Sequence, residues 1–272
     1  MRKLIAVNVD GTLVNTKGKI TNKTRDALIT ANNAGHEVMI VSGRPTKGLR
    51  DQAKILGFDK FGGILSSFNG GMLYDFKNKK ILANHPMSLD LAKEILSFSK
   101  DLDLGLIIPK GDVIVTDDSS DFYAKRESKI LNMPIKEVVN LRDELDFSPN
   151  KLLFTQDPDK IDPGANKLLE KFADRTYQVK SSRFFHEVMP LGLSKGKSIL
   201  EACNIFGIDR KDVIAFGDEM NDLSMLEVAG TAVAMANAIE KIKEIADYVT
   251  KSNNEDGIAY YLENFVLNKE NK

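Results

Sequence analysis

Apolar runs and amphipathic stretches alternate along the first third of the chain. Residues 3–9 (KLIAVNV) are apolar and β-branched, which predicts a buried strand. Residues 23–35 (KTRDALITANNAG) carry apolar side chains at helical spacing and end on a glycine, as helices commonly do. Apolar runs at residues 36–43 and 62–68 flank another helical pattern at residues 49–58. This alternation predicts a parallel sheet with helices on both faces.

The middle of the chain departs from this alternation. Helical patterns at residues 88–102 and 165–175 are mixed with short strand-like runs at residues 151–156 and 175–182. Alternation then resumes, with a helix, a strand at residues 212–218, a second helix and a last strand. We therefore predict an α/β fold in which residues 1–84 and 190–272 form a Rossmann-like parallel-sheet core. Residues 85–189 form an α+β domain inserted into that core.

Polar residues follow the predicted core strands, where ligands bind in open parallel sheets. They are Asn8, Asp10, Gly11 and Thr12 after the first strand, Ser42, Gly43 and Arg44 after the second, and Gly217, Asp218, Glu219, Asn221 and Asp222 after the strand at 212–218, with Lys195 at the start of a helix. Several acids that converge without enough local cations imply a hard metal ion, most simply Mg²⁺. Ser42 and Lys195 supply donors for a phosphate. A metal site beside an oxyanion site predicts phosphoryl transfer.

Four segments carry a family resemblance. VNVDGT, VSGRP, GLSKGKS and GDEMND resemble, in order, the four motifs of the haloacid-dehalogenase-like (HAD) phosphatases. SSFNGG, FHEVMP ahead of GLSKG, VAMANA and SNNEDGIA resemble the Cof-type group with its class IIB cap, and the C-terminal run is most similar to the sugar-phosphate phosphatases of that group. The match covers both core segments, whereas the cap matches in position and size. The resemblance implies a Mg²⁺-dependent phosphatase of small phosphorylated metabolites, with residues 85–189 as the cap that sets substrate specificity.

The resemblance also implies a role for each matching position. Position 8 is the nucleophile and a Mg²⁺ ligand, Asp10 is the general acid and base and lends its carbonyl to the metal, and Asp218 is the other direct ligand. Lys195 offsets the charge at position 8 and, with Ser42, acts on the transferring group. The phosphate-binding positions are Val9, Ser42, Gly43, Lys195 and Asn221. Thr12 and Asp222 support the metal ligands.

One position departs from the family pattern, because Asn8 stands where the family has an aspartate. A carboxylate attacks phosphorus to form an acyl phosphate, whereas a neutral amide oxygen is a far poorer nucleophile and its –NH₂ half is a donor. Of two explanations we favour the first, because the other candidate residues of the four motifs are all present. Either the chain is a nucleophile-disabled variant of a phosphatase, or it is a natural pseudoenzyme that binds Mg²⁺ and a phosphorylated ligand as a sensor or regulatory module. An aspartate codon at position 8 of the source gene would favour the first, and an asparagine codon the second.

Composition and charge limit the classes of partner that the chain is expected to bind. The chain of 272 residues is 42% hydrophobic with a net charge of −1, so it has no overall attraction for nucleic acid or an anionic membrane. No apolar run is long enough to span a bilayer, and the start of the sequence lacks the pattern of a signal peptide. The single cysteine, Cys203, lies in an apolar helical pattern, which favours a buried thiol in a reducing compartment. We expect a cytoplasmic protein whose partner is a small phosphorylated molecule.

Other motifs have weaker interpretations. GLSKGKS is close to a nucleotide-binding P-loop, but the first glycine of that motif would have to stand at position 191, which is Leu191. TDDSSD, at residues 116–121, lacks the glycine of a calcium-binding EF-hand loop, so a solvated loop is expected. Arg44 is open to two interpretations, a phosphate contact or a structural ion pair. His186 is either a substrate contact or an ordinary strand residue.

Overall fold

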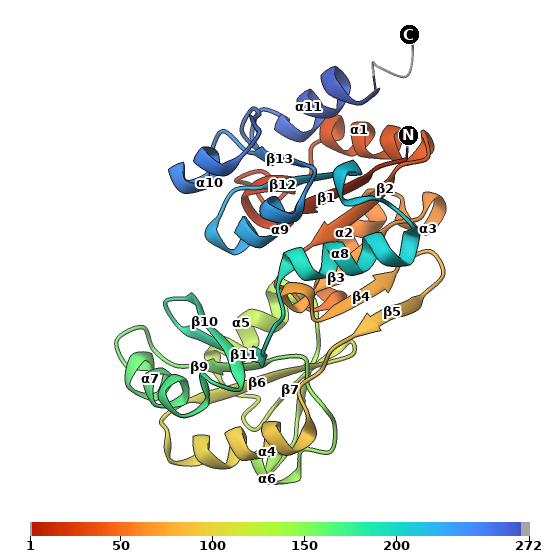
Figure 1. Ribbon diagram of the computed structural model, residues 1–272. Coiled ribbons are helices and arrows are strands. Elements are labelled where there is room, and N and C mark those ends of the chain that lie inside the picture. The colour runs from red at the N-terminus through yellow and green to blue at the C-terminus, as the bar shows by residue number, and fades with distance from the viewer. Residues whose placement is uncertain (1, 268–272) are drawn as a thin grey trace. The chain divides into compact units, whose positions relative to one another are not determined.

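The computed structural model describes residues 2–267, and the chain divides into two compact units (Figure 1). Residues 1–84 and 194–272 make up the first unit, and residues 85–193 make up the second. The second crossing between the units lies at residues 193–194, later than the predicted boundary at 189–190. The difference arises because β11 (Phe185–Pro190) remains paired with the sheet of the second unit as far as Pro190.

The first unit is built on one sheet that, within the described residues, has eight strands in the order β14-β13-β12-β1-β2-β3-β4-β5. The strands are β1 (Leu4–Asn8), β2 (Glu37–Val41), β3 (Ile64–Ser67), β4 (Met72–Asp75), β5 (Lys80–Asn84), β12 (Val213–Gly217), β13 (Thr231–Ala234) and β14 (Tyr248–Val249). From β14 to β3 all neighbours pair in parallel, which confirms the predicted parallel core. At one edge β4 and β5 add antiparallel pairs, which the alternation along the sequence did not predict.

Helices cover both faces of this sheet, because side chains on each central strand alternate between two cores. Ile5 and Val7 of β1 pack with residues of α1, α2 and α11, whereas Leu4 and Ala6 pack with residues of α8, α9 and α10. Figure 1 shows α1 beside α11, in agreement with the contacts between these two helices. The helices are α1 (Asn22–Asn33), α2 (Arg50–Ile55), α3 (Phe58–Phe61), α8 (Lys195–Phe206), α9 (Leu223–Val228), α10 (Glu240–Ile245) and α11 (Gly257–Phe265). Cys203 is buried on α8, as predicted, and burial raises the pKa of its thiol.

The second unit is an α+β fold with its own cores. Among the described residues its sheet has the strand order β10-β11-β9-β6-β7-β8, antiparallel except for the parallel pair β7 and β8. The remaining strands are β6 (Gly105–Lys110), β7 (Val113–Thr116), β8 (Ile135–Glu137), β9 (Leu152–Thr155) and β10 (Thr176–Ser182). The helices are α4 (Leu89–Phe98), α5 (Phe122–Leu131), α6 (Leu141–Glu144) and α7 (Ile161–Phe172). No helix within residues 2–267 is both long and apolar enough to cross a bilayer.

His186 is a buried member of the second unit. It lies on β11 with 5% of its surface exposed, and its Nε2 is 2.7 Å from Oε1 of Gln178 on β10. Burial lowers the pKa of His186 to about 4, although the nearby Glu187 acts in the opposite direction. The ring is therefore held as a neutral hydrogen-bonding side chain within its own sheet.

We predict that protonation of His186 weakens the second unit in mild acid. Between the reference pKa of 6.5 and the folded pKa of about 4, the unfolded state binds a proton that the folded state does not. The free energy of unfolding must therefore fall as the pH falls through this range, by on the order of 3 kcal/mol. His186→Gln keeps a donor for Gln178 but does not titrate, so calorimetric unfolding should show a flatter acid limb. Parallel pH profiles for the two proteins would contradict this assignment.

Candidate active site

The carboxyl ends of three strands meet at one edge of the first unit's sheet. β1 lies between β12 and β2 and pairs in parallel with both, with Val7 opposite Phe216 and Asn8 opposite Val41. The loops that follow these strands therefore leave the sheet side by side. This topology brings together residues that are about 200 positions apart in the sequence, such as Asn8 and Asp218.

A tight turn, residues 9–13, carries the chain out of β1. Gly11 has a φ of +76°, and a Cβ built on it would lie 2.0 Å from Oδ2 of Asp218. Only glycine combines this left-handed backbone with so close an approach. Nδ2 of Asn237 donates to the Gly11 carbonyl at 2.8 Å and secures the turn from the loop after β13. The turn thus packs directly against the loop that follows β12.

The first turn of α8 places a lysine inside this arrangement. A Cβ on Gly196 would lie 2.1 Å from the carbonyl oxygen of Ser224 on α9, so the two helices approach closely only because residue 196 is glycine. Lys195 is 2% exposed as a result. Its Nζ donates to Oδ1 of Asp222 at 2.6 Å and to Oδ1 of Asn8 at 3.1 Å. The ammonium group is therefore buried with its partners rather than displayed to solvent.

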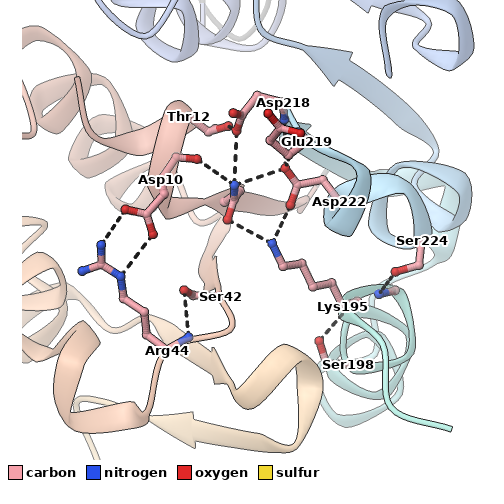
Figure 2. A network of polar contacts seen from close by, with 12 residues as sticks. Asp10, Thr12, Ser42, Arg44, Lys195, Ser198, Asp218, Glu219, Asp222 and Ser224 are labelled. Atoms are coloured by element: carbon pink, nitrogen blue, oxygen red, sulfur yellow. Dashed lines mark hydrogen bonds and ion pairs between the residues drawn. The ribbon is translucent and has the colours of Figure 1, made fainter. Parts of the chain in front are cut away.

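Asn8 joins the residues of a polar network, and Figure 2 labels its partners, which are Asp10, Lys195, Asp218 and Asp222. Its Nδ2 lies 2.9 Å from the carbonyl oxygen of Asp10, 3.2 Å from Oδ1 of Asp218 and 3.1 Å from Oδ2 of Asp222. Its Oδ1 accepts from Lys195. The amide thus presents its donor end to three oxygens and its acceptor end to a cation.

The two aspartates that follow β12 are held by further donors. Asp222 is fully buried, and its Oδ2 accepts from the backbone amides of Asp218 at 2.9 Å and Glu219 at 3.2 Å. Oδ1 of Asp218 accepts from the Thr12 hydroxyl at 2.6 Å. Burial raises the pKa of Asp218 to about 6, although the Thr12 hydrogen bond acts against this shift. Thr12 and Asp222 therefore lie where they can orient Asn8 and Asp218.

The Asp10 side chain points away from Asn8 and forms an ion pair. Arg44 Nη2 and Nε donate to its two carboxylate oxygens at 2.5 and 3.1 Å, an ion pair drawn in Figure 2. This carboxylate is largely exposed. Of the two interpretations of Arg44, the ion pair is the one present. The Arg44 backbone amide also donates to Oγ of the buried Ser42 at 3.2 Å, which leaves the hydroxyl hydrogen of Ser42 to donate elsewhere.

Three candidate residues lie outside the side-chain network. Val9 is buried in the apolar core beneath the sheet edge, so only its backbone can reach a ligand. Gly43 has no side chain, and a Cβ there would lie 3.0 Å from Oδ1 of Asn69. Asn221 is exposed in the turn after β12, and among residues 2–267 no hydrogen bond links its side chain to Asn8 or Lys195.

Two further asparagines hold the loops of the site in place, and the sequence analysis assigned no role to either of them. Asn237 holds Gly11, and its Oδ1 accepts from the backbone amide of Asn253 at 2.9 Å. Nδ2 of Asn253 in turn donates to the Val14 carbonyl at 2.8 Å. Both lie in the motifs VAMANA and SNNEDGIA, which follow strands of the same sheet. Their position after parallel strands is the signal that could have identified them.

The phosphatases that the sequence resembles generally use Mg²⁺, but the residues present in this chain do not fit the cation as they stand. The proposed ligands are Asn8, the Asp10 carbonyl and Asp218, and here the atom that faces the other two is the Nδ2 donor of Asn8. Rotating the amide would bring its oxygen toward a cation but would place Nδ2 against the Lys195 ammonium. Within residues 2–267, no group of three or more His, Cys, Asp or Glu side chains is arranged to hold a metal ion. A carboxylate at position 8 would remove the mismatch, because both of its ends accept.

Comparison with known proteins assigns the family. A model of the haloacid dehalogenase-like hydrolases matches residues 5–262. The curated 5-amino-6-(5-phospho-D-ribitylamino)uracil phosphatase YwtE of Bacillus subtilis is 30% identical, over 97% of this chain and 98% of its own. A crystal structure of a haloacid dehalogenase-like hydrolase from Bacteroides thetaiotaomicron is 33% identical with a TM-score of 0.91, over 97% of this chain and 99% of that one.

A more distant structure shares the fold. The subclass IIB sugar phosphatase BT4131 is 24% identical with a TM-score of 0.79, over 97% of this chain and 98% of that one. The matches span both units of the chain, the inserted one included. The chain is therefore a member of the haloacid dehalogenase-like hydrolases, in their Cof-type group.

Proposed function

We propose that this site is that of a phosphatase for phosphate monoesters of small metabolites, sugar phosphates above all, in which Asn8 has replaced the aspartate nucleophile. The observation that carries the proposal is the buried network at the carboxyl ends of β1 and β12, in which Lys195 lies 3.1 Å from the side chain of residue 8. Two relatives support the substrate class. The name of YwtE specifies a phosphorylated ribityl compound, and BT4131 is described as a sugar phosphatase.

With aspartate at position 8, the nearby groups would take part in the following reaction. The carboxylate attacks phosphorus, the bond from phosphorus to the ester oxygen breaks, and Asp10 gives that oxygen a proton. Asp10 then takes a proton from water as the water attacks the aspartyl phosphate, which releases inorganic phosphate and restores residue 8. Lys195 balances negative charge at residue 8, and the Ser42 hydroxyl donates to the transferring group.

The ion pair between Asp10 and Arg44 holds the Asp10 carboxylate away from the position in which it would transfer a proton. Asp10 must leave the guanidinium, or share it, to reach an ester oxygen. A phosphate dianion is itself a good bidentate partner for arginine and competes for the same donors. We therefore propose that substrate binding weakens the ion pair and makes Asp10 available, with Gly43, Asn221 and the Val9 backbone as further phosphate contacts.

For the protein with aspartate at position 8 we propose Mg²⁺ as the cofactor. That carboxylate, the Asp10 carbonyl and Asp218 would hold it, and the ion would supply positive charge beside the phosphate. Residues of the second unit, 85–193, are proposed to determine which phosphate ester is accepted. Both assignments rest on the family resemblance together with the identities of these residues.

The hydrogen-bond partners of Asn8 favour a second candidate function, which is ligand binding without turnover. Each end of its amide faces partners of the correct kind, with three acceptors near Nδ2 and a donor at Oδ1. A chain that uses this site to bind a phosphorylated ligand, as a sensor or regulatory module, would keep such an arrangement. The two candidates differ in whether a carboxylate at position 8 is sufficient for turnover.

We predict that Asn8→Asp restores phosphatase activity. Loss of the nucleophile of a covalent mechanism lowers kcat by on the order of a million-fold in another hydrolase, so the chain as it stands should be almost inactive. Release of inorganic phosphate from a small sugar phosphate in Mg²⁺ measures the difference. Asn254→Asp is the matched control, because it makes the same charge change on an exposed residue that uses only its oxygen.

Two outcomes would reject parts of this proposal. If the Asn8 protein already turns over as fast as the Asn8→Asp variant, residue 8 is not the nucleophile. If Asn8→Asp folds and binds a sugar phosphate but releases no phosphate from a panel of esters, the binding module is the better description.

A further prediction separates the two roles of Asp10. In the Asn8→Asp background, Asp10→Asn cannot protonate an alcohol leaving group or activate water. p-Nitrophenol is a far better leaving group than a sugar alcohol and needs no such proton. p-Nitrophenyl phosphate should therefore give a burst of nitrophenol equal to the enzyme concentration, followed by a slow steady state, while a sugar phosphate gives no burst. Equal slowing of both substrates without a burst would assign the acid–base role to another group.

A further inference from the structure

The amide of Asn8 lies where a nitrogen is required and an oxygen would be repelled. Its Nδ2 is within 3.2 Å of three oxygens, the carbonyl of Asp10 and the carboxylates of Asp218 and Asp222. Asn8 is only 5% exposed, so water has little access to separate these groups. An aspartate of the same shape would place an oxygen without a hydrogen against all three.

The charges of the buried groups also indicate that a carboxylate at position 8 would be repelled. Asp218 and Asp222 carry two negative charges when ionised, Lys195 carries one positive charge, and Asn8 carries none. A carboxylate at position 8 would raise the excess negative charge of this set from one to two. Like charges about 3 Å apart in a buried site repel strongly, and a divalent cation is the usual remedy.

The other hydrogen bonds of the site hold the amide in place. Thr12 donates to the Asp218 oxygen that Asn8 also contacts, and the backbone amides of residues 218 and 219 donate to the Asp222 oxygen that Asn8 contacts. Lys195 fixes the orientation of the amide, because only its oxygen can face the ammonium group. A cation that approached the Asp10 carbonyl and Asp218 would have to displace Nδ2.

We infer that the Asn8 carboxamide takes the place of the divalent cation in this chain, bridging the Asp10 carbonyl, Asp218 and Asp222, so that the fold is stable without Mg²⁺ and gains little from it. The Asn8→Asp protein, in contrast, is destabilised without a divalent cation and recovers when one binds. This role of Asn8 concerns the folded state and holds whether or not the site hydrolyses a phosphate ester.

Thermal unfolding tests the inference without any measurement of activity. The unmodified chain, Asn8→Asp and the control Asn254→Asp are each melted in EDTA and in millimolar MgCl₂, with NaCl added to equalise ionic strength. In EDTA, Asn8→Asp should melt about 5 to 10 °C below the unmodified chain, and Mg²⁺ should recover most of that difference. The unmodified chain and Asn254→Asp should shift by no more than about 2 °C on addition of Mg²⁺.

Two results would overturn the inference. One is an equal gain in melting temperature from Mg²⁺ for the unmodified chain and for Asn8→Asp, and the other is an Asn8→Asp protein as stable in EDTA as the unmodified chain. If Asn8→Asp does not fold in EDTA, calorimetric titration of Mg²⁺ into the unmodified chain tests the inference instead. Binding of Mg²⁺ at micromolar concentration would show that the amide does not take the place of the cation. A variant that Mg²⁺ stabilises but that cleaves no ester would leave the inference intact and reject the phosphatase.

Discussion

The buried contact of Lys195 with Asp222 and Asn8 is the interaction on which the rest of the site depends. It joins the start of α8, the loop after β12 and the end of β1, three segments with no continuity in sequence. Because both charged side chains are almost fully buried, removal of either would leave an uncompensated charge in the protein interior, which costs several kcal/mol. The lysine therefore fixes the positions of residue 8 and Asp222, and in the proposed phosphatase it would also balance the charge of a phosphate.

The glycines at positions 11 and 196 are what allow this contact to form. Each brings backbone or side-chain atoms within about 2 Å of where a Cβ would lie, one against Asp218 and the other against α9. The first delivers the turn after β1 to the loop after β12, and the second lets the lysine enter the interior. Close packing of backbone, rather than any single hydrogen bond, thus sets the separation of these polar groups.

Position 8 shows how chemistry and stability make opposite demands on one residue. In the proposed phosphatase the nucleophile is a carboxylate, and a negatively charged acceptor among Asp218, Asp222 and the Asp10 carbonyl would be repelled until a cation binds. An asparagine of the same shape turns its donor nitrogen toward these oxygens, but it would be a far poorer nucleophile toward phosphorus. Sites that are optimal for a reaction are often locally unfavourable for folding, and substitutions that relieve the conflict commonly abolish activity.

Hydrophobic periodicity and turn residues are local properties, so the amino-acid sequence was enough to predict the parallel core, the insertion near residue 85 and the set of polar residues that follow the strands. The resemblance of its motifs also implied that residue 8 is an amide at the position of the family's aspartate. The folded structure was needed to establish that the Asp10 carboxylate pairs with Arg44, that Asn237 secures Gly11, and that the amide of Asn8 points its nitrogen toward the acids. These contacts join segments far apart in the chain, and their orientation follows from three-dimensional packing and hydrogen-bond partners, which no local pattern records.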